Sequence, residues 1–459
     1  MRTIFITLFQ GIEVKNIMRT NVYRELISHS DTRLICFLDN QKRVDICRRE
    51  FNHDRIIYET VEHFRPAFLD SFFQAVSFYF INTETIRLKR FMAWEETKNP
   101  IHFLTALINL VVAHGFVRRC IRILDYVLVR DTNFKKFFEQ YKPDVVLLAH
   151  LFERREVNLL REAKRQKVPT VGFINSWDKV TGRCGIRLLP DRMAVFNSLV
   201  RQEVIEHVDM PESQVVVIGL PQYDIYTKRE PHNRKKVWDE FNIDIQKRII
   251  VYAPMGRTYS NSDWDIIDFL QGAIENNSIQ NAALLVRFQP NDFFDETELK
   301  KRPWLKYDHP GIRFSTERGV DWDMSFKDID NLRHILESLS VLVCYASSMS
   351  IDAAVFNKPV INIDFETRKE KLLRKSPTAF YRFSHYRKML EADGVALVKT
   401  SQELIDRINE YLNNPLLHSD KRALLVKEQC GIFDGRSGER LAKLVTDTAK
   451  NTYSSTNVA

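Results

Sequence analysis

The sequence is poor in the residues that mark irregular or repetitive proteins. Its 459 residues include only 14 glycines and 15 prolines, while 44% are hydrophobic and 28% are charged. These are ordinary values for a globular chain, so they exclude collagen-like, low-complexity and wholly disordered proteins. At roughly 100 to 200 residues per domain, the length predicts two or three folded domains.

Cysteine and long apolar runs are also scarce. The six cysteines lie far apart, without a Cys-x-x-Cys pair or a histidine at zinc-ligand spacing, so we expect free thiols in a reducing cytosol. The longest apolar stretch, residues 103–113, falls well short of the ~20 residues that a membrane-spanning helix needs. Residues 1–10 lack a small-residue cleavage site, and we expect them to form a strand rather than a signal peptide.

Several catalytic motifs are absent as well. The sequence has no Ser-His-Asp order, no HExxH, no GxxxxGK[ST] loop and no cluster of metal ligands. These absences exclude hydrolytic triads, zinc proteases and P-loop ATPases. We expect neither a metal nor a cofactor.

The charge balance is only mildly basic. The chain has 68 Lys and Arg against 60 Asp and Glu, a formal net charge of +8. Residues 1–225 hold 33 basic and 27 acidic side chains, so most of the excess lies in the N-terminal half. An excess this small does not indicate nucleic acid, but its position favours a surface that meets phosphate or anionic lipid.

Short apolar runs alternate with amphipathic helical patterns in two series. The first series comprises residues 3–9, 33–38, 144–149, 170–174, 192–196 and 215–218, and the second comprises residues 249–253, 283–288, 341–345, 360–363 and 395–398. Such runs, separated by helices, are typical of parallel α/β sheets. We therefore predict two Rossmann-like domains, residues 1–225 and 248–434, joined by a linker at 226–247.

Residues 60–142 interrupt the first domain without a clear strand. Phe64, Phe68 and Phe72 recur at helical spacing, and several arginines follow, among them Arg118 and Arg122. Two interpretations stay open: a helical insertion packed on its own domain, or an amphipathic surface that makes a peripheral contact with an anionic membrane. Residues 451–459 lack apolar periodicity and predict a loose tail.

The most informative segment reads YASSMSIDAAVFNKPVINID and spans residues 345–364. An apolar strand ends there in a turn of small residues, and a helix opens near Met349. A helix start of this kind presents backbone N–H groups to an anion. We predict that five residues help to bind a donor diphosphate, the alternative being that the serines only cap the helix: Ser347, Ser348, Met349, Ser350 and Asp352.

Two further loops follow strands of the second domain. Gly256 and Arg257 come after its first strand, and Arg287 and Gln289 end the next. Because parallel strands open their carboxyl ends onto one crevice, we expect these loops to lie beside the serine-rich turn. Gly256 would let the backbone approach a ligand, and the two arginines would neutralise a diphosphate. For each arginine alone, a surface ion pair is the alternative.

The first domain supplies the predicted acceptor side. Residues 172–182 follow a strand and carry Asp178, which we predict to be the general base for an acceptor hydroxyl. An N-cap or Asx-turn role is the alternative for Asp178. We place five further residues on the acceptor side, with His150 and Glu153 as second-rank candidates for the base: Gly11, Glu13, His150, Glu153 and Trp177.

Five motifs together resemble a known family. They read FINSWDKVTG, GLPQYD, VYAPMGR, YASSMSIDAAVFNKPVI and FDGRSGERLAK, and they run in this order from residue 173 to residue 443. Over about residues 144–443 the chain is similar to GT-B-type glycosyltransferases, in the branch of the CDP-glycerol glycerophosphotransferases and bacterial surface-polysaccharide transferases. It resembles the UDP-N-acetylglucosamine 2-epimerases more distantly.

The resemblance implies an acceptor domain and a nucleotide-donor domain that face an interdomain cleft, with a last helix at 435–450 crossing back to the first domain. It also implies a metal-independent, inverting transfer. Asp178 stands where the glycerophosphotransferases have the histidine that serves as base, a change that favours a sugar over a polyol phosphate. Gln289 stands where a second histidine is usual, so Arg257 or Arg287 would have to neutralise the leaving phosphate.

We therefore predict a glycosyltransferase of capsule, lipopolysaccharide or similar cell-envelope synthesis. It would move a sugar from a nucleotide-activated donor to a hydroxyl of a surface-polysaccharide or lipid-linked acceptor, in the cytoplasm or peripherally on the inner face of the cytoplasmic membrane. The alternatives are a polyol-phosphate transferase with a CDP-activated donor, an enzyme like the UDP-sugar 2-epimerases, and a non-catalytic nucleotide-binding scaffold. No nucleic acid partner is expected.

Overall fold

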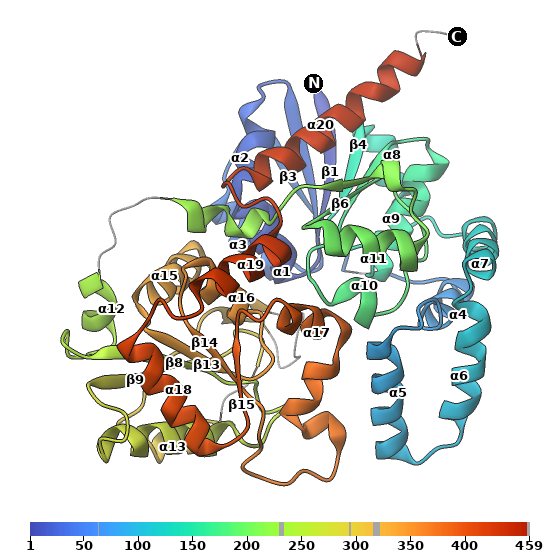
Figure 1. Ribbon diagram of the computed structural model, residues 1–459. Coiled ribbons are helices and arrows are strands. Elements are labelled where there is room, and N and C mark those ends of the chain that lie inside the picture. Colours follow the sequence, from blue (N-terminus) through green and yellow to red (C-terminus); the bar gives the residue numbers. More distant parts are fainter. Residues whose placement is uncertain (63, 229–233, 293–294, 315–321, 457–459) are drawn as a thin grey trace. The chain divides into compact units, whose positions relative to one another are not determined.

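The computed structural model describes residues 1–62, 64–228, 234–292, 295–314 and 322–456 (Figure 1). The chain forms two compact units. Unit 1 comprises residues 1–90, 99–227 and 430–459, and unit 2 comprises residues 91–98 and 228–429. Each unit has its own parallel sheet and its own hydrophobic core.

The sheet of unit 1 has seven parallel strands in the order β3-β2-β1-β4-β5-β6-β7. Its strands are β1 (Arg2–Leu8), β2 (Thr32–Leu38), β3 (Ile56–Thr60), β4 (Val145–Leu148), β5 (Thr170–Phe173), β6 (Arg192–Val195) and β7 (Val215–Val217). The strand order reverses between β1 and β4, as in dinucleotide-binding folds, where ligands bind at the carboxyl ends beside this point.

The sheet of unit 2 repeats this order with six parallel strands, β10-β9-β8-β13-β14-β15. Its strands are β8 (Arg248–Ala253), β9 (Ala282–Arg287), β10 (Lys306–Asp308), β13 (Val341–Cys344), β14 (Val360–Ile363) and β15 (Ala396–Val398). A separate antiparallel pair joins β11 (Ile312–Arg313) to β12 (Trp322–Asp323). Here the order reverses between β8 and β13.

Helices connect the strands of both sheets. Up to β7 they are α1 (Gly11–Glu13), the π-helix η1 (Val14–Met18), α2 (Asn21–Ser28), α3 (Gln41–Glu50), α4 (Phe68–Ser77), α5 (Glu84–Thr97), α6 (Ile101–Val112), α7 (Gly115–Leu128), α8 (Lys135–Tyr141), α9 (Arg154–Arg165), α10 (Lys179–Gly182), α11 (Ser198–Val208) and the 3₁₀ turn η2 (Glu212–Gln214). After β7 follow η3 (Pro221–Thr227), α12 (Arg234–Glu240), α13 (Asp263–Glu275), α14 (Glu296–Lys300), α15 (Phe326–Ser338), α16 (Met349–Val355), η4 (Leu373–Lys375), η5 (Pro377–Arg382), α17 (Ser384–Glu391), α18 (Ser401–Asn413), α19 (Ser419–Cys430) and α20 (Ser437–Thr456).

The predicted α/β fold with two Rossmann-like sheets is confirmed. Each of the eleven predicted strands is present, with ends within one residue of the prediction. The strands that the sequence pattern missed are the edge strands β3 and β10 and the two-residue strands β11 and β12. Most side chains of β3 and β10 are only partly buried, so these strands lack the continuous apolar run that marks a central strand.

The last helix belongs to unit 1 and packs against α2 and η3. Asp224 of the GLPQYD motif caps it, because its carboxylate accepts hydrogen bonds from the N–H groups of Ser437 (3.0 Å) and Gly438 (2.8 Å). Two of the family motifs therefore meet at one helix start. Helix α20 continues to Thr456, so the expectation of a loose tail from residue 451 was wrong, while residues 457–459 lie outside the described residues.

The helical insertion is fastened to unit 1 by buried ion pairs. Arg187 contacts Asp70 of α4 at 2.9 Å and Asp125 of α7 at 2.8 Å, and Arg161 of α9 contacts Asp125 at 2.7 Å. All four side chains are buried. Removing one partner of such a pair leaves an uncompensated charge, so the network holds α4 and α7 in place. Helix α8 adds Phe138 to the core, edge-on to Phe5 of β1.

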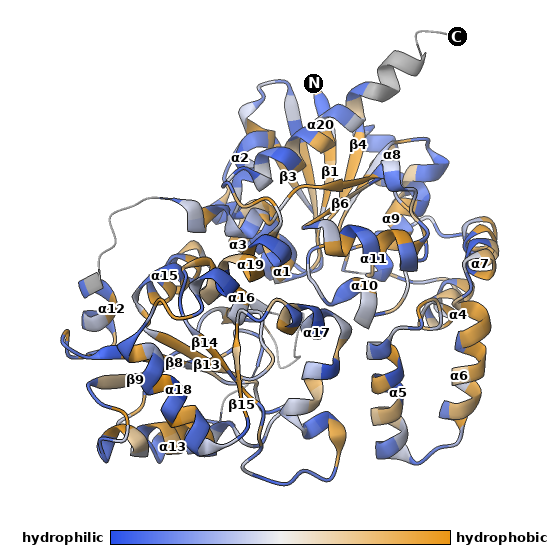
Figure 2. Cartoon of the chain, in the orientation of Figure 1, coloured by the Kyte–Doolittle hydropathy of each residue, from blue (hydrophilic) through white to orange (hydrophobic). Residues whose placement is uncertain are grey.

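Another face of the same insertion exposes apolar side chains. Figure 2 shows α6 as largely hydrophobic along its length. Phe68 of α4 is 86% exposed, Leu107 of α6 62% and Phe116 of α7 71%. Among the described residues, no single helix is long and apolar enough to cross a membrane; only α6 and α7 together, bent by 90°, reach that length and composition. Exposed apolar surface of this extent is unusual on a soluble monomer.

Candidate functional site

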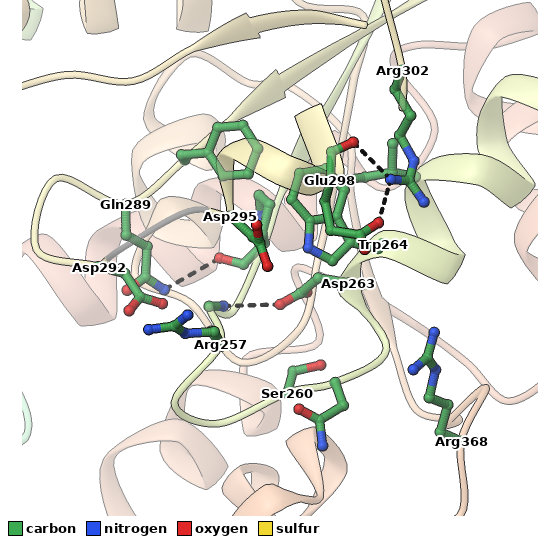
Figure 3. Close-up of a pocket in the computed structure, with 15 residues that line it drawn as sticks. Arg257, Ser260, Asp263, Trp264, Gln289, Asp292, Asp295, Glu298, Arg302 and Arg368 are labelled. Atoms are coloured by element: carbon green, nitrogen blue, oxygen red, sulfur yellow. Dashed lines mark hydrogen bonds and ion pairs between the residues drawn. The ribbon is translucent and has the colours of Figure 1, made fainter. Parts of the chain in front are cut away.

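A cavity of about 310 Å³ opens at the carboxyl edge of the sheet in unit 2 (Figure 3). Its walls come from the loop after β8, the first turns of α13 and the loop after β9. Trp264 and Phe288 supply aromatic surface with their ring centroids 5.8 Å apart. A space of this size and character fits a nucleoside.

Asp263 fixes the loop that follows β8. Its carboxylate accepts hydrogen bonds from the Tyr252 hydroxyl (2.7 Å) and from the N–H groups of Met255 (3.1 Å) and Gly256 (2.9 Å). Burial raises the pKa of Asp263 to about 6, although these three donors act in the opposite direction. The loop is therefore held by the protein itself, and these two N–H groups already have an acceptor.

Glycine is required at position 256. Its φ is +92°, and a Cβ atom there would lie 1.9 Å from a carboxylate oxygen of Asp292. The amide of Gln289 ties the same loop to the next one, because its Nε2 donates to the carbonyl oxygens of Met255 (2.8 Å) and Pro254 (3.2 Å). Three of the predicted donor residues, Gly256, Arg257 and Gln289, thus line one cavity.

Most charged side chains around the cavity are paired. Arg302 contacts Glu298 at 2.6 Å and lies over the Trp264 ring at 4.8 Å, and Arg368 contacts Asp265 at 2.6 Å. Arg257 is exposed at the rim, and we find no ion pair for it within the described part of the chain. The lining also includes the carboxylates of Asp292, Asp295 and Glu298. The cavity thus combines hydrogen-bond acceptors with two exposed cations, Arg257 and the ion-paired Arg368.

Arg287 lies elsewhere than expected. It ends β9, but its buried guanidinium is ion-paired with Asp308 of the neighbouring strand β10, and it does not line the cavity. The alternative expectation for Arg287 was a surface ion pair. The structure has an ion pair, but it is largely buried. Arg287 therefore supports the sheet edge.

The serine-rich turn lies at the same sheet edge but is occupied by its own bonds. The N–H of Met349 donates to the Ser347 hydroxyl (3.3 Å), and the N–H of Ser350 donates to the Ser347 carbonyl (3.2 Å). The Ser350 hydroxyl is fully buried within hydrogen-bond distance of Tyr386 (3.2 Å). Ser347, Ser348, Met349, Ser350 and Asp352 do not line the cavity, and the capping interpretation fits Ser347.

The carboxyl edge of the sheet in unit 1 carries a buried charged cluster. Glu13 in α1, Glu156 in α9 and Lys179 in α10 are all buried beside His150, which follows β4. Glu156 accepts hydrogen bonds from the Thr7 hydroxyl and from the N–H of His150 (3.1 Å). These residues come from four segments that meet where the strand order reverses.

The titration of this cluster is strongly perturbed. Burial raises the pKa of Glu13 well above its usual value, and the nearby Glu156 carboxylate raises it further; burial also raises the pKa of Glu156 to about 7. Burial also lowers the pKa of Lys179 to about 7 and that of His150 well below its usual value. Side chains poised near neutral pH are typical of functional sites.

The predicted base, Asp178, lies at the same edge, immediately before α10. Its carboxylate accepts a hydrogen bond from the Ser176 hydroxyl at 2.5 Å. Trp177 packs edge-on against Phe196, with ring centroids 5.2 Å apart. Glu153 caps α9 by accepting from the N–H of Arg155 (2.7 Å), and buried Gly11 begins α1. Asp178, Trp177, Glu13 and His150 therefore share one sheet edge, while Glu153 has a capping role.

Sequence reasoning missed several residues of both edges. In unit 2 these are Asp263, Trp264, Asp292, Asp295 and Arg302, and in unit 1 they are Glu156 and Lys179. Glu156 and Lys179 are charged residues in helical patterns, where the usual expectation is exposure. The signal that could have marked Asp263 is its position, ten residues after a strand end, in a loop that already carried Gly256 and Arg257. Among the described residues no group of three or more His, Cys, Asp or Glu side chains could hold a metal ion.

The sequence of the second half identifies the family. Residues 191–447, more than half of the chain, match the sequence profile of the CDP-glycerol:poly(glycerophosphate) glycerophosphotransferases. The chain belongs to this family. It is accordingly a nucleotide-dependent transferase of the GT-B superfamily, as the predicted resemblance implied. No curated protein matches the sequence.

Solved structures share the fold at low sequence identity. The wall teichoic acid polymerase TagF has 12% identity and a TM-score of 0.56, with 98% of this chain and 90% of that chain covered. UDP-GlcNAc 2-epimerase from Neisseria meningitidis, solved with UDP-GlcNAc, has 11% identity and a TM-score of 0.54, with coverages of 97% and 100%. A glycosyltransferase from Rickettsia africae has 12% identity and a TM-score of 0.50, with coverages of 98% and 99%.

Proposed function

We propose that the protein transfers a polyol phosphate from a CDP-activated donor to a hydroxyl group of a surface polymer or its lipid-linked precursor. The observation that carries this proposal is the family match over residues 191–447, which includes the whole sheet of unit 2. The cavity at the edge of that sheet supports it, because its volume suits a nucleoside and Trp264 offers a ring for the base.

The residues around the cavity suit the two halves of a nucleotide. Carboxylates such as Asp292 and Asp295 accept hydrogen bonds from ribose hydroxyls or a base amino group. The guanidinium of Arg257, exposed at the rim, is the cation for the phosphates. Gln289 is neutral and holds the loops together, so we assign the charge compensation to Arg257.

Asp178 remains our candidate for the general base. In the proposed reaction the acceptor oxygen forms a bond to the phosphorus next to the polyol. The bond between that phosphorus and the bridging oxygen breaks, and the nucleoside monophosphate leaves with the electron pair. The proton of the acceptor hydroxyl passes to the Asp178 carboxylate, which the Ser176 hydroxyl orients.

Sugar transfer is the second candidate, and one observation favours it. The resemblance seen in the sequence implies a histidine in the glycerophosphotransferases at the place of Asp178, which lies outside the matched residues 191–447. In that reaction the acceptor oxygen bonds to the anomeric carbon instead, and a nucleoside diphosphate leaves. The leaving nucleotide therefore separates the two reactions.

The experiment is to incubate the full chain with CDP-glycerol, or with a panel of nucleotide sugars, in the presence of a lipid-linked acceptor, and to identify the released nucleotide. Release of CMP from CDP-glycerol supports the proposal. Release of a nucleoside diphosphate from a nucleotide sugar establishes the second candidate instead. Saturable nucleotide binding without any release would contradict both and indicate a binding scaffold.

We also propose that the exposed apolar face of α6 and α7 brings the enzyme to an anionic membrane, where a lipid-linked acceptor lies. Leu107→Asp should reduce flotation with anionic vesicles, because it places a charge in that face. Leu416→Asp is the matched control, since Leu416 is similarly exposed but belongs to unit 2. Equal flotation of both variants and the unaltered protein would contradict the membrane contact.

A further inference from the structure

A second and larger hollow lies in unit 1, away from the edge that carries Asp178. This groove of about 1060 Å³ is bounded by α7 and by the loops that precede β5, β6 and β7. Loops that precede parallel strands lie at the amino edge of the sheet, whereas ligands of these folds bind at the carboxyl edge. The groove is therefore separate from the candidate acceptor side.

One wall of the groove is apolar. Leu188 and Leu189 come from the loop before β6, and Val168 comes from the loop before β5. Ile123 of α7 lines the groove and is 63% exposed. The same residue belongs to the exposed apolar surface of α6 and α7, so the groove opens directly beside the proposed membrane contact.

The other wall holds a buried guanidinium with unused hydrogen-bonding capacity. Arg122 is only 6% exposed; its Nε donates to the Ile186 carbonyl (3.0 Å) and its Nη1 to Asp209 (2.7 Å). Its Nη2 has no hydrogen-bond partner among the described residues. A buried donor without an acceptor is costly. Arg122 also lines the groove and adds its positive charge to that wall.

The charge of the lining is positive. Arg119, Lys164 and Lys167 join Arg122, against the two carboxylates of Asp191 and Asp209. Asp209 is already bound by Arg118 (2.6 Å) and Arg122, and Asp191 lies 3.6 Å from Lys164. The groove therefore favours an anion beside a hydrocarbon surface.

We infer that this groove binds one anionic phospholipid, with its phosphate at Arg122 and Arg119 and an acyl chain along Val168, Leu188 and Leu189. A free phosphate would leave the apolar wall uncovered, and a neutral lipid would leave the excess positive charge of the lining uncompensated. The inference extends the proposed membrane contact to a defined lipid site and rests on that contact for the source of the lipid.

The test uses the full chain and dihexanoyl phosphatidylglycerol below its micellar concentration, titrated by calorimetry. We expect saturable binding of one lipid per chain and no comparable binding of dihexanoyl phosphatidylcholine. Arg119→Glu should weaken the binding about tenfold or more, because it reverses a charge at the phosphate. Arg130→Glu is the matched control: Arg130 is exposed in the same unit, carries the same charge and does not line the groove.

Two outcomes would overturn the lipid site. Glycerol phosphate that binds as tightly as the short-chain lipid would make the groove a site for free phosphate, and an absence of saturable lipid binding would remove the site altogether. The Leu107→Asp variant separates this inference from the membrane contact. Monomeric lipid should bind that variant normally even though its flotation is reduced. A protein that still floats but binds no monomeric lipid would contradict the lipid site and leave the membrane contact standing.

Discussion

The two sheets of this protein have the same strand order but carry different chemistry at their carboxyl edges. In unit 1, Glu13, Glu156 and Lys179 are buried at that edge, and each is hydrogen-bonded to a neighbouring side chain or backbone N–H group. In unit 2, the edge is open, and Arg257 and several carboxylates line a cavity. The same topology thus gathers charged residues at the carboxyl edge of both sheets, while burial decides whether the pKa of a charged group is shifted or the group stays accessible.

The largest expected effect concerns the carboxyl edge of the sheet in unit 1, where we predict the general base. Asp178→Asn should lower turnover by about 100-fold or more, because Asn keeps the shape of the loop but cannot take a proton. Nucleotide affinity should hardly change, since the cavity belongs to unit 2. The measurement is nucleotide release with the true donor and acceptor. Near-normal turnover would leave Asp178 as a loop residue and move the base to His150 or Glu153.

The next largest expected effect is on stability, and it distinguishes Arg287 from Arg257, for which the sequence predicted the same role. Arg287→Ala should lower the free energy of unfolding by about 3 kcal/mol, because Asp308 loses the partner of a largely buried ion pair. Urea unfolding of Arg287→Ala and Arg257→Ala measures the contrast. We expect the second variant to unfold like the unaltered protein, since Arg257 is exposed. Equal stability of all three proteins would show that Arg287 has no structural role.

A smaller expected effect is a pH dependence of the free energy of unfolding, which comes from the buried charged cluster of unit 1. The folded-state pKa of Glu156 is raised from 4.5 to about 7, so the folded protein holds this proton more tightly than the unfolded chain. Its contribution to stability is therefore fully present below pH 4.5 and is lost as the pH rises through about 7, by up to roughly 3 kcal/mol. Lys179 stays charged over most of this range, because its pKa is also about 7.

The Glu156→Gln variant removes this titration. Urea unfolding at pH 5, 6 and 7 should show a stability that falls less steeply with pH in the variant than in the unaltered protein. Asp31→Asn, at an exposed residue, is the control and should follow the unaltered protein. Parallel curves for all three proteins would mean that Glu156 is not perturbed by its surroundings.

The fold could be predicted from the sequence because central parallel strands are buried on both faces. Runs such as residues 249–253 and 341–345 are apolar throughout and are bounded by turn residues, so the sequence predicts their ends to within one residue. Edge strands such as β3 and β10 carry mixed, half-exposed residues and gave no such run. The local sequence pattern therefore predicts central strands better than edge strands.

The candidate site was only partly predictable, for a physical reason. Gly256, Arg257 and Gln289 follow strand ends directly, and parallel topology alone brings them to one edge. Which arginine faces a cavity depends on pairing across strands, so Arg287 was misplaced, and the serine-rich turn gave no hint that its N–H groups bond to Ser347. The burial of Glu156 and Lys179 depends on packing from four segments that are far apart in sequence.

The central claim is that the cavity of unit 2 binds the nucleotide of the donor. Calorimetric titration of the full chain with CDP-glycerol tests it most directly, with Arg257→Ala as the variant and Lys300→Ala as the control, since Lys300 is exposed nearby but does not line the cavity. We predict one nucleotide per chain, binding about tenfold or more weaker in Arg257→Ala and unchanged in Lys300→Ala, because Arg257 supplies a hydrogen bond to a charged phosphate. Equal affinity in all three proteins would contradict the claim.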